Sequence, residues 1–275
     1  MKPYTTLKTK DDLKINLFSN QLKSKKGVIL VTHGMGEHAL RYSEMARYFT
    51  EAGFAVVAFD IRGHGTSEGK RGHTPSYDLL MDDIERIYDK VKSDYLDAPV
   101  VLFGHSMGGN LILNFLLRRK RKVAGAIVTG PYLKLGFEPP KWKIILAKLS
   151  SNILPSLSQP TELEKPALTR TSQVVRDYED DHLVHDRITS SFFINVHYAG
   201  QYAIDYAHRI TTPLLIMHGS EDRLTSPEGT IEFIKNARGH VSSKIWDGLY
   251  HELHNEPERN EVFLYELNWL KELLN

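Results

Sequence analysis

Five short aliphatic runs constrain the fold more than any other feature of this sequence. Each run is continuous rather than alternating, which is typical of strands buried on both faces of a parallel sheet. The runs are Val28–Val31, Phe54–Phe59, Val100–Phe103, Ala126–Val128 and Leu214–Met217. Between and after them, residues 40–52, 77–95, 107–119 and 228–238 have the apolar spacing of amphipathic helices. Strands that alternate with helices predict an α/β fold, with helices on both faces of a mostly parallel central sheet.

The two ends of the chain add to this scheme. Residues 4–7 and 13–18 alternate apolar and polar side chains around Asp11 and Asp12, which predicts a short antiparallel pair. Near the other end, apolar residues recur at the spacing of one helix face, at Phe263, Leu267, Leu270 and Leu274.

One long segment interrupts the alternation of strands and helices. From about residue 132 to residue 210 the sequence predicts no strand, and it mixes several prolines with short amphipathic pieces. We interpret residues 132–210 as a helical cap inserted over the carboxyl edge of the sheet. Residues 1–131 and 211–275 would then form one core domain.

Composition excludes several classes of function. Lys and Arg total 35 against 34 for Asp and Glu, so nothing in the charge favours nucleic acid. There is no cysteine, which rules out disulfides, thiolate catalysis and cysteine-ligated zinc. Neither a signal-peptide core nor an apolar run of about 20 residues is present, so we expect a cytoplasmic protein.

Gly104-His105-Ser106-Met107-Gly108 lies where a predicted strand passes directly into a predicted helix. This is the context of a nucleophile elbow, G-x-S-x-G, in which a sharp turn exposes the serine hydroxyl at the edge of the sheet. The glycines keep strand and helix free of clashes, and the helix N-terminus offers N–H groups to a developing oxyanion. Ser106 is therefore the predicted nucleophile.

A serine nucleophile needs an orienting carboxylate and a histidine base further along the chain. Asp222 follows the strand Leu214–Met217 and is the predicted carboxylate, with Glu221 as the local alternative. His251 lies in the expected late loop and is the predicted base, with His254 as its alternative. No acidic third ligand accompanies these two histidines, so we expect no metal there.

The oxyanion requires a second backbone donor, from the loop after an early strand. The sequence there is His33-Gly34-Met35-Gly36-Glu37-His38, in which the glycines let the backbone approach a substrate. The N–H groups of Met35 and Met107 are the predicted donors, and Gly34 is a predicted substrate contact.

These motifs resemble the monoacylglycerol lipase and lysophospholipase branch of the α/β-hydrolases. The resemblance includes the elbow, His33–His38, Arg41-Tyr42, Asp60–Gly69 and the cap segment Asp181–His185. His182 departs from the family pattern, which usually has proline there. The resemblance implies the α/β-hydrolase fold and hydrolysis of a single-acyl glycerol ester without a cofactor. It also implies Ser106, Asp222 and His251 as triad and Met35 and Met107 as oxyanion donors.

The predicted cap contains an unusually apolar stretch. We expect it to line an acyl tunnel and to contact a membrane surface peripherally while collecting an amphiphilic substrate. The residues concerned are Leu135, Phe137, Trp142, Ile145 and Leu149. The acidic and histidine-containing residues from Tyr178 to Asp186 are interpreted as a solvated helix face rather than a metal site.

Other functions remain compatible with these residues. A lysophospholipase, a carboxylesterase or a small-peptide aminopeptidase would use the same catalytic groups. A dehalogenase or epoxide hydrolase needs an acidic nucleophile, which Ser106 is not. A non-catalytic hydrolase-like binding protein would usually have lost one of the three catalytic residues.

Overall fold

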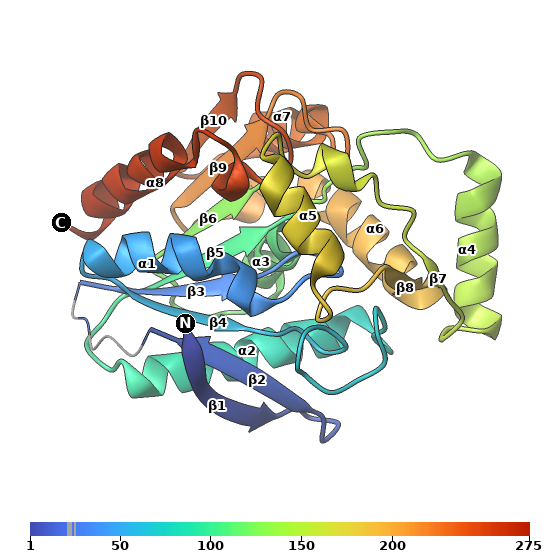
Figure 1. Cartoon of the computed structure of the whole chain (residues 1–275), viewed down its shortest axis with the longest axis horizontal. Coiled ribbons are helices and arrows are strands. Elements are labelled where there is room, and N and C mark those ends of the chain that lie inside the picture. The colour runs from blue at the N-terminus through green and yellow to red at the C-terminus, as the bar shows by residue number, and fades with distance from the viewer. Residues whose placement is uncertain (21–23, 25) are drawn as a thin grey trace.

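The computed structural model describes residues 1–20, 24 and 26–275. In this part of the chain, the central sheet has eight strands in the order β1-β2-β4-β3-β5-β6-β9-β10 (Figure 1). β1 and β2 pair antiparallel and β2 pairs antiparallel with β4, whereas all other neighbours are parallel. The strands are β1 (Lys2–Lys8), β2 (Lys14–Ser19), β3 (Val28–Thr32), β4 (Ala55–Phe59), β5 (Val100–His105), β6 (Gly125–Thr129), β9 (Leu214–Gly219) and β10 (Val241–Trp246).

Helices cover both faces of this sheet. The α-helices are α1 (Ser43–Glu51), α2 (Tyr77–Asp94), α3 (Met107–Arg118), α4 (Lys141–Ile153), α5 (Ser172–Asp180), α6 (Ser190–Asp205), α7 (Pro227–Asn236) and α8 (Arg259–Leu274). Short 3-10 turns are η1 (Ala39–Tyr42), η2 (Lys165–Ala167), η3 (Ala207–Arg209) and η4 (Leu253–Asn255). Side-chain caps fix several starts: Ser76 accepts a hydrogen bond from the N–H of Leu79 in α2, and Ser226 accepts one from Gly229 in α7.

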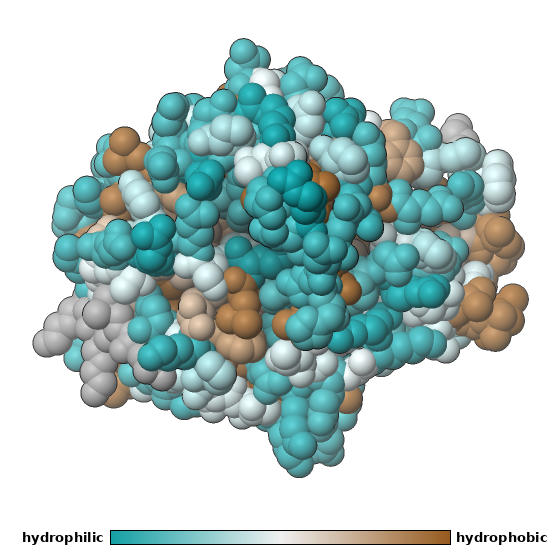
Figure 2. Space-filling model, in the orientation of Figure 1, coloured by the Kyte–Doolittle hydropathy of each residue, from teal (hydrophilic) through white to brown (hydrophobic). Residues whose placement is uncertain are grey.

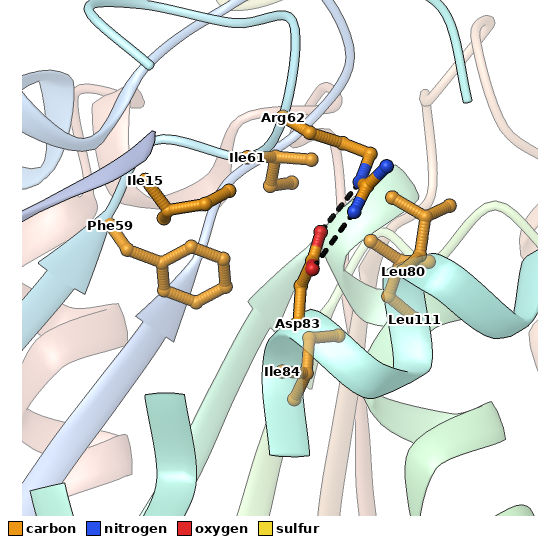
Figure 3. Close-up of a pocket in the computed structure, with 8 residues that line it drawn as sticks. All are labelled: Ile15, Phe59, Ile61, Arg62, Leu80, Asp83, Ile84 and Leu111. Atoms are coloured by element: carbon orange, nitrogen blue, oxygen red, sulfur yellow. Dashed lines mark hydrogen bonds and ion pairs between the residues drawn. The ribbon is translucent and has the colours of Figure 1, made fainter. Parts of the chain in front are cut away.

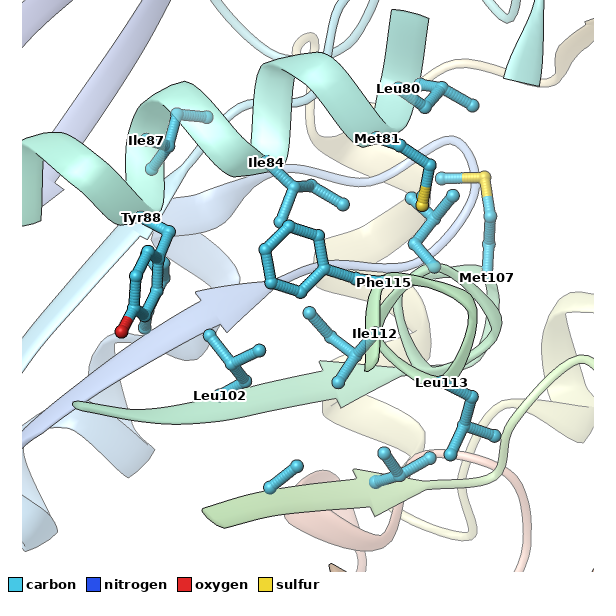
Figure 4. Packing of buried hydrophobic residues seen from close by; sticks show 14 of the residues in the cluster. Leu80, Met81, Ile84, Ile87, Tyr88, Leu102, Met107, Ile112, Leu113 and Phe115 are labelled. Carbon is cyan, nitrogen blue, oxygen red and sulfur yellow. The ribbon is translucent and has the colours of Figure 1, made fainter. Parts of the chain in front are cut away.

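Alternate residues of each parallel strand point to opposite faces, and each face has its own apolar layer. In β5, Val100 and Leu102 pack with α2, α3 and α6, whereas Val101 and Phe103 pack with α1 and α8. Figure 4 shows α2 and α3 over β5, with Ile84, Phe115 and Ile112 directed toward one another. Because both faces are covered, the central strands are fully buried, as their continuous aliphatic sequences predicted.

A buried arginine connects the loop after β4 with two other elements. Arg62 projects among apolar side chains and forms a two-point ion pair with Asp83 of α2, at 2.6 and 2.9 Å (Figure 3). Nη1 and Nη2 of Arg62 also donate to Asp11, in the β1–β2 turn, both at 2.9 Å. Such bidentate pairing compensates for removing the guanidinium from water.

The segment from 132 to 210 differs in two ways from the sequence-based expectation. It contains the strands β7 (Ser158–Pro160) and β8 (Arg187–Thr189), which pair antiparallel. The prediction of no strand here was wrong, because three residues are too few to establish a period. In addition, α6 packs on α3: the side-chain amides of Asn110 and Asn114 donate to the carbonyls of Val196 and Ala199, both at 3.0 Å. The division into core 1–131 and 211–275 and cap 132–210 stays a prediction.

The helix α4 projects from the body of the molecule (Figure 1). Apolar residues gather at the same edge in the space-filling view (Figure 2). Trp142 is 62% exposed and Ile145 is 59% exposed. This helix therefore presents apolar side chains to solvent, in contrast to the helices that cover the sheet.

Candidate active site

Ser106 lies at the turn between β5 and α3 in a strained backbone conformation. Its φ is 54° and its ψ is −118°, and its N–H donates to the carbonyl of Thr129 at 3.0 Å. A Cβ on Gly104 would lie 2.5 Å from the carbonyl oxygen of Gly108. A Cβ on Gly108 would lie 2.1 Å from the carbonyl oxygen of Thr32. The turn is therefore tight enough to require both glycines, as the elbow motif predicts.

Asp222 lies in the loop after β9 and is buried. Its Oδ1 accepts hydrogen bonds from the N–H groups of Leu224 at 2.8 Å and Thr225 at 3.0 Å. Its Oδ2 lies 2.6 Å from Nδ1 of His251. Burial alone would raise the pKa of Asp222, but His251 and His218 outweigh it and hold that pKa well below its ordinary value. Asp222 is therefore a buried carboxylate that stays ionised beside an imidazole.

The two alternative residues, Glu221 for the carboxylate and His254 for the base, lie in different environments from the residues they would replace. Glu221 is exposed, whereas Asp222 contacts His251. His254 is buried and stacks on the ring of Tyr42, with centroids 4.8 Å apart. Neither ring nitrogen of His254 has a hydrogen-bond partner among the described residues. The pairing of a carboxylate with a histidine at this edge is therefore formed by Asp222 and His251.

His251 follows β10 and is buried on the carboxyl side of the sheet. Burial lowers the pKa of its imidazole, but the Asp222 carboxylate outweighs burial, so the pKa lies above its ordinary value. The centroid of its ring lies 4.6 Å from that of His105, the residue before Ser106. A Cβ on Gly130 would lie 3.2 Å from its Nδ1. His251 thus lies beside the elbow.

The hydroxyl of Ser106 makes no hydrogen bond to His251 or to any other residue in the described part of the chain. A serine Oγ moves between staggered rotamers by one torsion about Cα–Cβ. Catalytic hydrogen bonds are also often long or misaligned before substrate binds. The structure therefore brings His251 next to the elbow without forming the bond between base and nucleophile.

The loop after β3 lies against the elbow. A Cβ on Gly34 would lie 3.3 Å from the Cβ of Ser106, so the backbone passes close to the serine. The N–H of Gly34 donates to Oε1 of Glu37 at 2.6 Å, which fixes the loop. Among the described residues, the N–H groups of Met35 and Met107 have no protein acceptor. Both are therefore available to a substrate oxygen.

A buried ionic network that the sequence-based reasoning missed connects this loop with the histidine loop. Arg41 donates to Glu37 at 2.8 Å and to both oxygens of Glu252 at 2.8 and 2.9 Å. Burial raises the pKa of Glu252, but Arg41 outweighs it and lowers that pKa to about 2. The signal was present, since Glu37 and Arg41 lie four residues apart directly after the glycine-rich loop. Glu252 adjoins His251, so the network positions both loops together.

The predicted acyl-tunnel residues have a different environment. Trp142, Ile145 and Leu149 are 62, 59 and 54% exposed on α4, and Phe137 is 60% exposed. Leu135 is only partly buried, and it forms an isolated antiparallel β-bridge with Thr225. In this conformation the three α4 side chains face solvent, because nothing in the described part of the chain covers that side of the helix. Their contact with substrate stays a prediction.

Comparison with known proteins places this geometry in a family. The family model described as serine aminopeptidase, S33, matches residues 23–258. The chain belongs to this family. It is 32% identical to the monoacylglycerol lipase of Mycolicibacterium smegmatis, over 89% of this chain and 88% of that protein. It is 34% identical to an uncharacterized abhydrolase domain-containing protein of Dictyostelium discoideum over 96% of its own length, but spans only 28% of that protein.

A solved structure agrees with this family assignment. The crystal structure of Paleococcus ferrophilus monoacylglycerol lipase superposes with a TM-score of 0.87 at 32% identity, covering 95% of this chain and 99% of that one. The predicted α/β-hydrolase fold and the predicted relationship to monoacylglycerol lipases are confirmed. Among the helices of the described residues, none is long and apolar enough to cross a bilayer.

Proposed function

We propose that the chain is a serine ester hydrolase that cleaves a monoacylglycerol into a fatty acid and glycerol. The observation that carries the proposal is the 2.6 Å contact between Asp222 Oδ2 and His251 Nδ1, beside a serine held at φ 54° on a strand-to-helix turn. The names of the relatives support the substrate class, since two of them are monoacylglycerol lipases.

The proposed reaction proceeds in two halves. His251 takes the proton of Ser106 as Oγ attacks the ester carbonyl, and Asp222 orients the imidazole and stabilises its charged form. The N–H groups of Met35 and Met107 stabilise the tetrahedral oxyanion. His251 then protonates the departing glycerol, and a water activated by the same residue releases the fatty acid from Ser106. No cofactor enters these steps.

Labelling and a substrate panel test this proposal. A fluorophosphonate probe should label the wild-type protein and not Ser106→Ala. Monoacylglycerols should be hydrolysed with higher kcat/KM than lysophospholipids, simple acetate esters and aminoacyl p-nitroanilides. Absence of labelling would contradict the nucleophile and favour a binding protein. Preference for another member of the panel would contradict the substrate while keeping the serine mechanism.

We also propose that α4, in the cap predicted at residues 132–210, contacts the surface of lipid aggregates. The exposed side chains of Trp142, Ile145 and Leu149 support this, because contiguous apolar surface on a helix is characteristic of interaction sites. Trp142→Glu and Ile145→Glu should reduce sedimentation with phosphatidylcholine vesicles and slow turnover of long-chain monoacylglycerol more than that of p-nitrophenyl acetate.

Leu96 provides a matched control for these variants. It is an exposed apolar residue after α2, 75% exposed and outside the proposed cap. Leu96→Glu should leave vesicle binding and turnover unchanged. Unchanged vesicle sedimentation in the α4 variants would contradict the lipid contact, and equal loss of activity on long-chain and acetate esters would contradict the acyl tunnel.

A further inference from the structure

A second histidine contacts the buried carboxylate of the candidate triad. His218, in β9, places Nε2 at 2.9 Å from Oδ2 of Asp222, the same oxygen that lies 2.6 Å from Nδ1 of His251. His218 is completely buried. The proposed reaction assigns it no role, although it lies four residues before Asp222 and touches that carboxylate directly.

The surroundings of His218 determine which of its nitrogens carries the proton. Besides Asp222, Nε2 lies 3.2 Å from the carbonyl oxygen of Thr225, so two acceptors face this atom and it must carry a hydrogen. On the other side of the ring, Nδ1 lies 2.8 Å from the hydroxyl of Thr230 in α7. The two acceptors at Nε2 fix the tautomer, and in that neutral ring Nδ1 accepts from the Thr230 hydroxyl, which helps hold the ring in the orientation that donates to Asp222.

We propose that His218 is a positioning residue that holds the Asp222 carboxylate in place for His251. A carboxylate fixed on Oδ1 by two backbone N–H groups can still tilt, and His218 supplies the donor that fixes Oδ2. Thr225 assists, since its hydroxyl lies 2.9 Å from the same oxygen. The proposal rests on the proposed function, in which Asp222 serves His251.

Sharing one oxygen between two imidazoles also limits how basic Asp222 makes His251. Each hydrogen bond to the ionised carboxylate withdraws electron density from it and stabilises its charged form. Without the donor on His218, Oδ2 would interact more strongly with the proton on His251, so His251 would become more basic. The other titratable groups that act on His251 or Asp222 are Glu37, His105, Glu252 and His254, and Arg41 pairs with both glutamates.

The decisive experiment compares the pH dependence of variants that do and do not keep a donor at this position. His218→Leu should shift the acid limb of kcat/KM for p-nitrophenyl butyrate to higher pH by roughly one unit, which lowers kcat/KM about tenfold below that limb. His218→Gln, which can still donate to Oδ2, should restore the wild-type limb. An acid limb that is unchanged in His218→Leu would overturn the proposal, whereas a limb that moves to lower pH would show that the Asp222 carboxylate tilts away from His251 once His218 no longer holds it.

Two further measurements keep the test independent of folding and of substrate. If His218→Leu does not fold, His218→Phe keeps a ring of similar shape without a donor and should shift the limb in the same direction, with His218→Gln as the matched control. NMR titration of the His251 ring needs no substrate. It should report a higher pKa for His251 in His218→Phe than in the wild type even if the ester assay shows no activity. An unchanged pKa would refute the role of His218, whereas an inactive wild type would refute only the proposed function.

Discussion

A Cβ on Gly108 would lie 2.1 Å from the carbonyl oxygen of Thr32, so the first turn of α3 touches the end of β3 directly. Because the obstacle is backbone, it cannot rotate away as a side chain could. We expect Gly108→Ala to move α3 relative to β3, to lower the free energy of unfolding by about 3 kcal/mol, and to abolish ester hydrolysis. Thermal unfolding and turnover of p-nitrophenyl butyrate measure the two effects.

Gly248→Ala is the control for this substitution. Gly248 has φ 71°, but nothing lies within 4 Å of an added Cβ. It therefore reports the cost of a positive φ alone, about 1 kcal/mol. If Gly108→Ala were no less stable than Gly248→Ala, the contact between α3 and β3 would not be a rigid one.

The strained backbone at Ser106 predicts a stability difference between two inactive variants. With φ at 54°, Ser106 occupies a conformation that glycine adopts more readily than residues with a Cβ. Ser106→Gly and Ser106→Ala should both lose esterase activity. Ser106→Gly should be the more stable by about 1 kcal/mol in urea unfolding. Equal stability would show that the turn relaxes once the hydroxyl is removed.

The charge on Asp222 should control the basicity of His251. Burial lowers the pKa of His251 and the Asp222 carboxylate more than reverses this effect. Asp222→Asn removes the charge, so the pKa of His251 should fall below that of the wild type in an NMR titration. If Asp222 orients the base as proposed, kcat should fall roughly 10³- to 10⁴-fold.

Glu221→Gln is the matched control, because Glu221 is the adjacent carboxylate and is exposed. It should leave kcat and the pKa of His251 at wild-type values. A large loss in Glu221→Gln with an active Asp222→Asn would reverse the choice between the two residues.

Features that depend on local pattern could be predicted from the sequence. The runs at Val28–Val31 and Val100–Phe103 indicate strands buried on both faces because no polar residue interrupts them. The elbow at Ser106 was predictable because its glycines are a local steric requirement. The choice of Asp222 over Glu221 followed from the local pattern G-x-x-D-x-hydrophobic at residues 219–224.

Features that depend on contacts between distant residues could not be predicted. His218 reads as an ordinary strand residue, and its contact with Thr230 depends on how α7 packs on β9. The pairing of Arg41 with Glu252 joins residues 211 positions apart. The apolar spacing in α4 indicated a helix but not what covers it, and in the structure Trp142 is exposed. Sequence periodicity describes one element at a time, whereas these features arise between elements.

Glu266 in α8 is completely buried, and neither carboxylate oxygen has a hydrogen-bond partner among the described residues. Burial raises the pKa of Glu266 from 4.5 to about 8. Below pH 4.5 the folded and unfolded states both hold the proton, so the raised pKa costs no stability there. As pH rises toward 8, the unfolded state has released its proton and the folded state has not, so the free energy of unfolding falls. At pH 7 the loss is about 3 kcal/mol.

Replacing Glu266 with an apolar residue of similar size should remove this pH-dependent loss. Glu266→Leu should be more stable than the wild type in urea unfolding, and its advantage should grow between pH 5 and pH 8. Glu261→Gln, at an exposed position in the first turn of the same helix, controls for removing a negative charge and should show no such growth. An advantage of Glu266→Leu that is the same at both pH values would mean that the carboxyl titrates normally in the folded protein, with a partner such as water compensating for its burial.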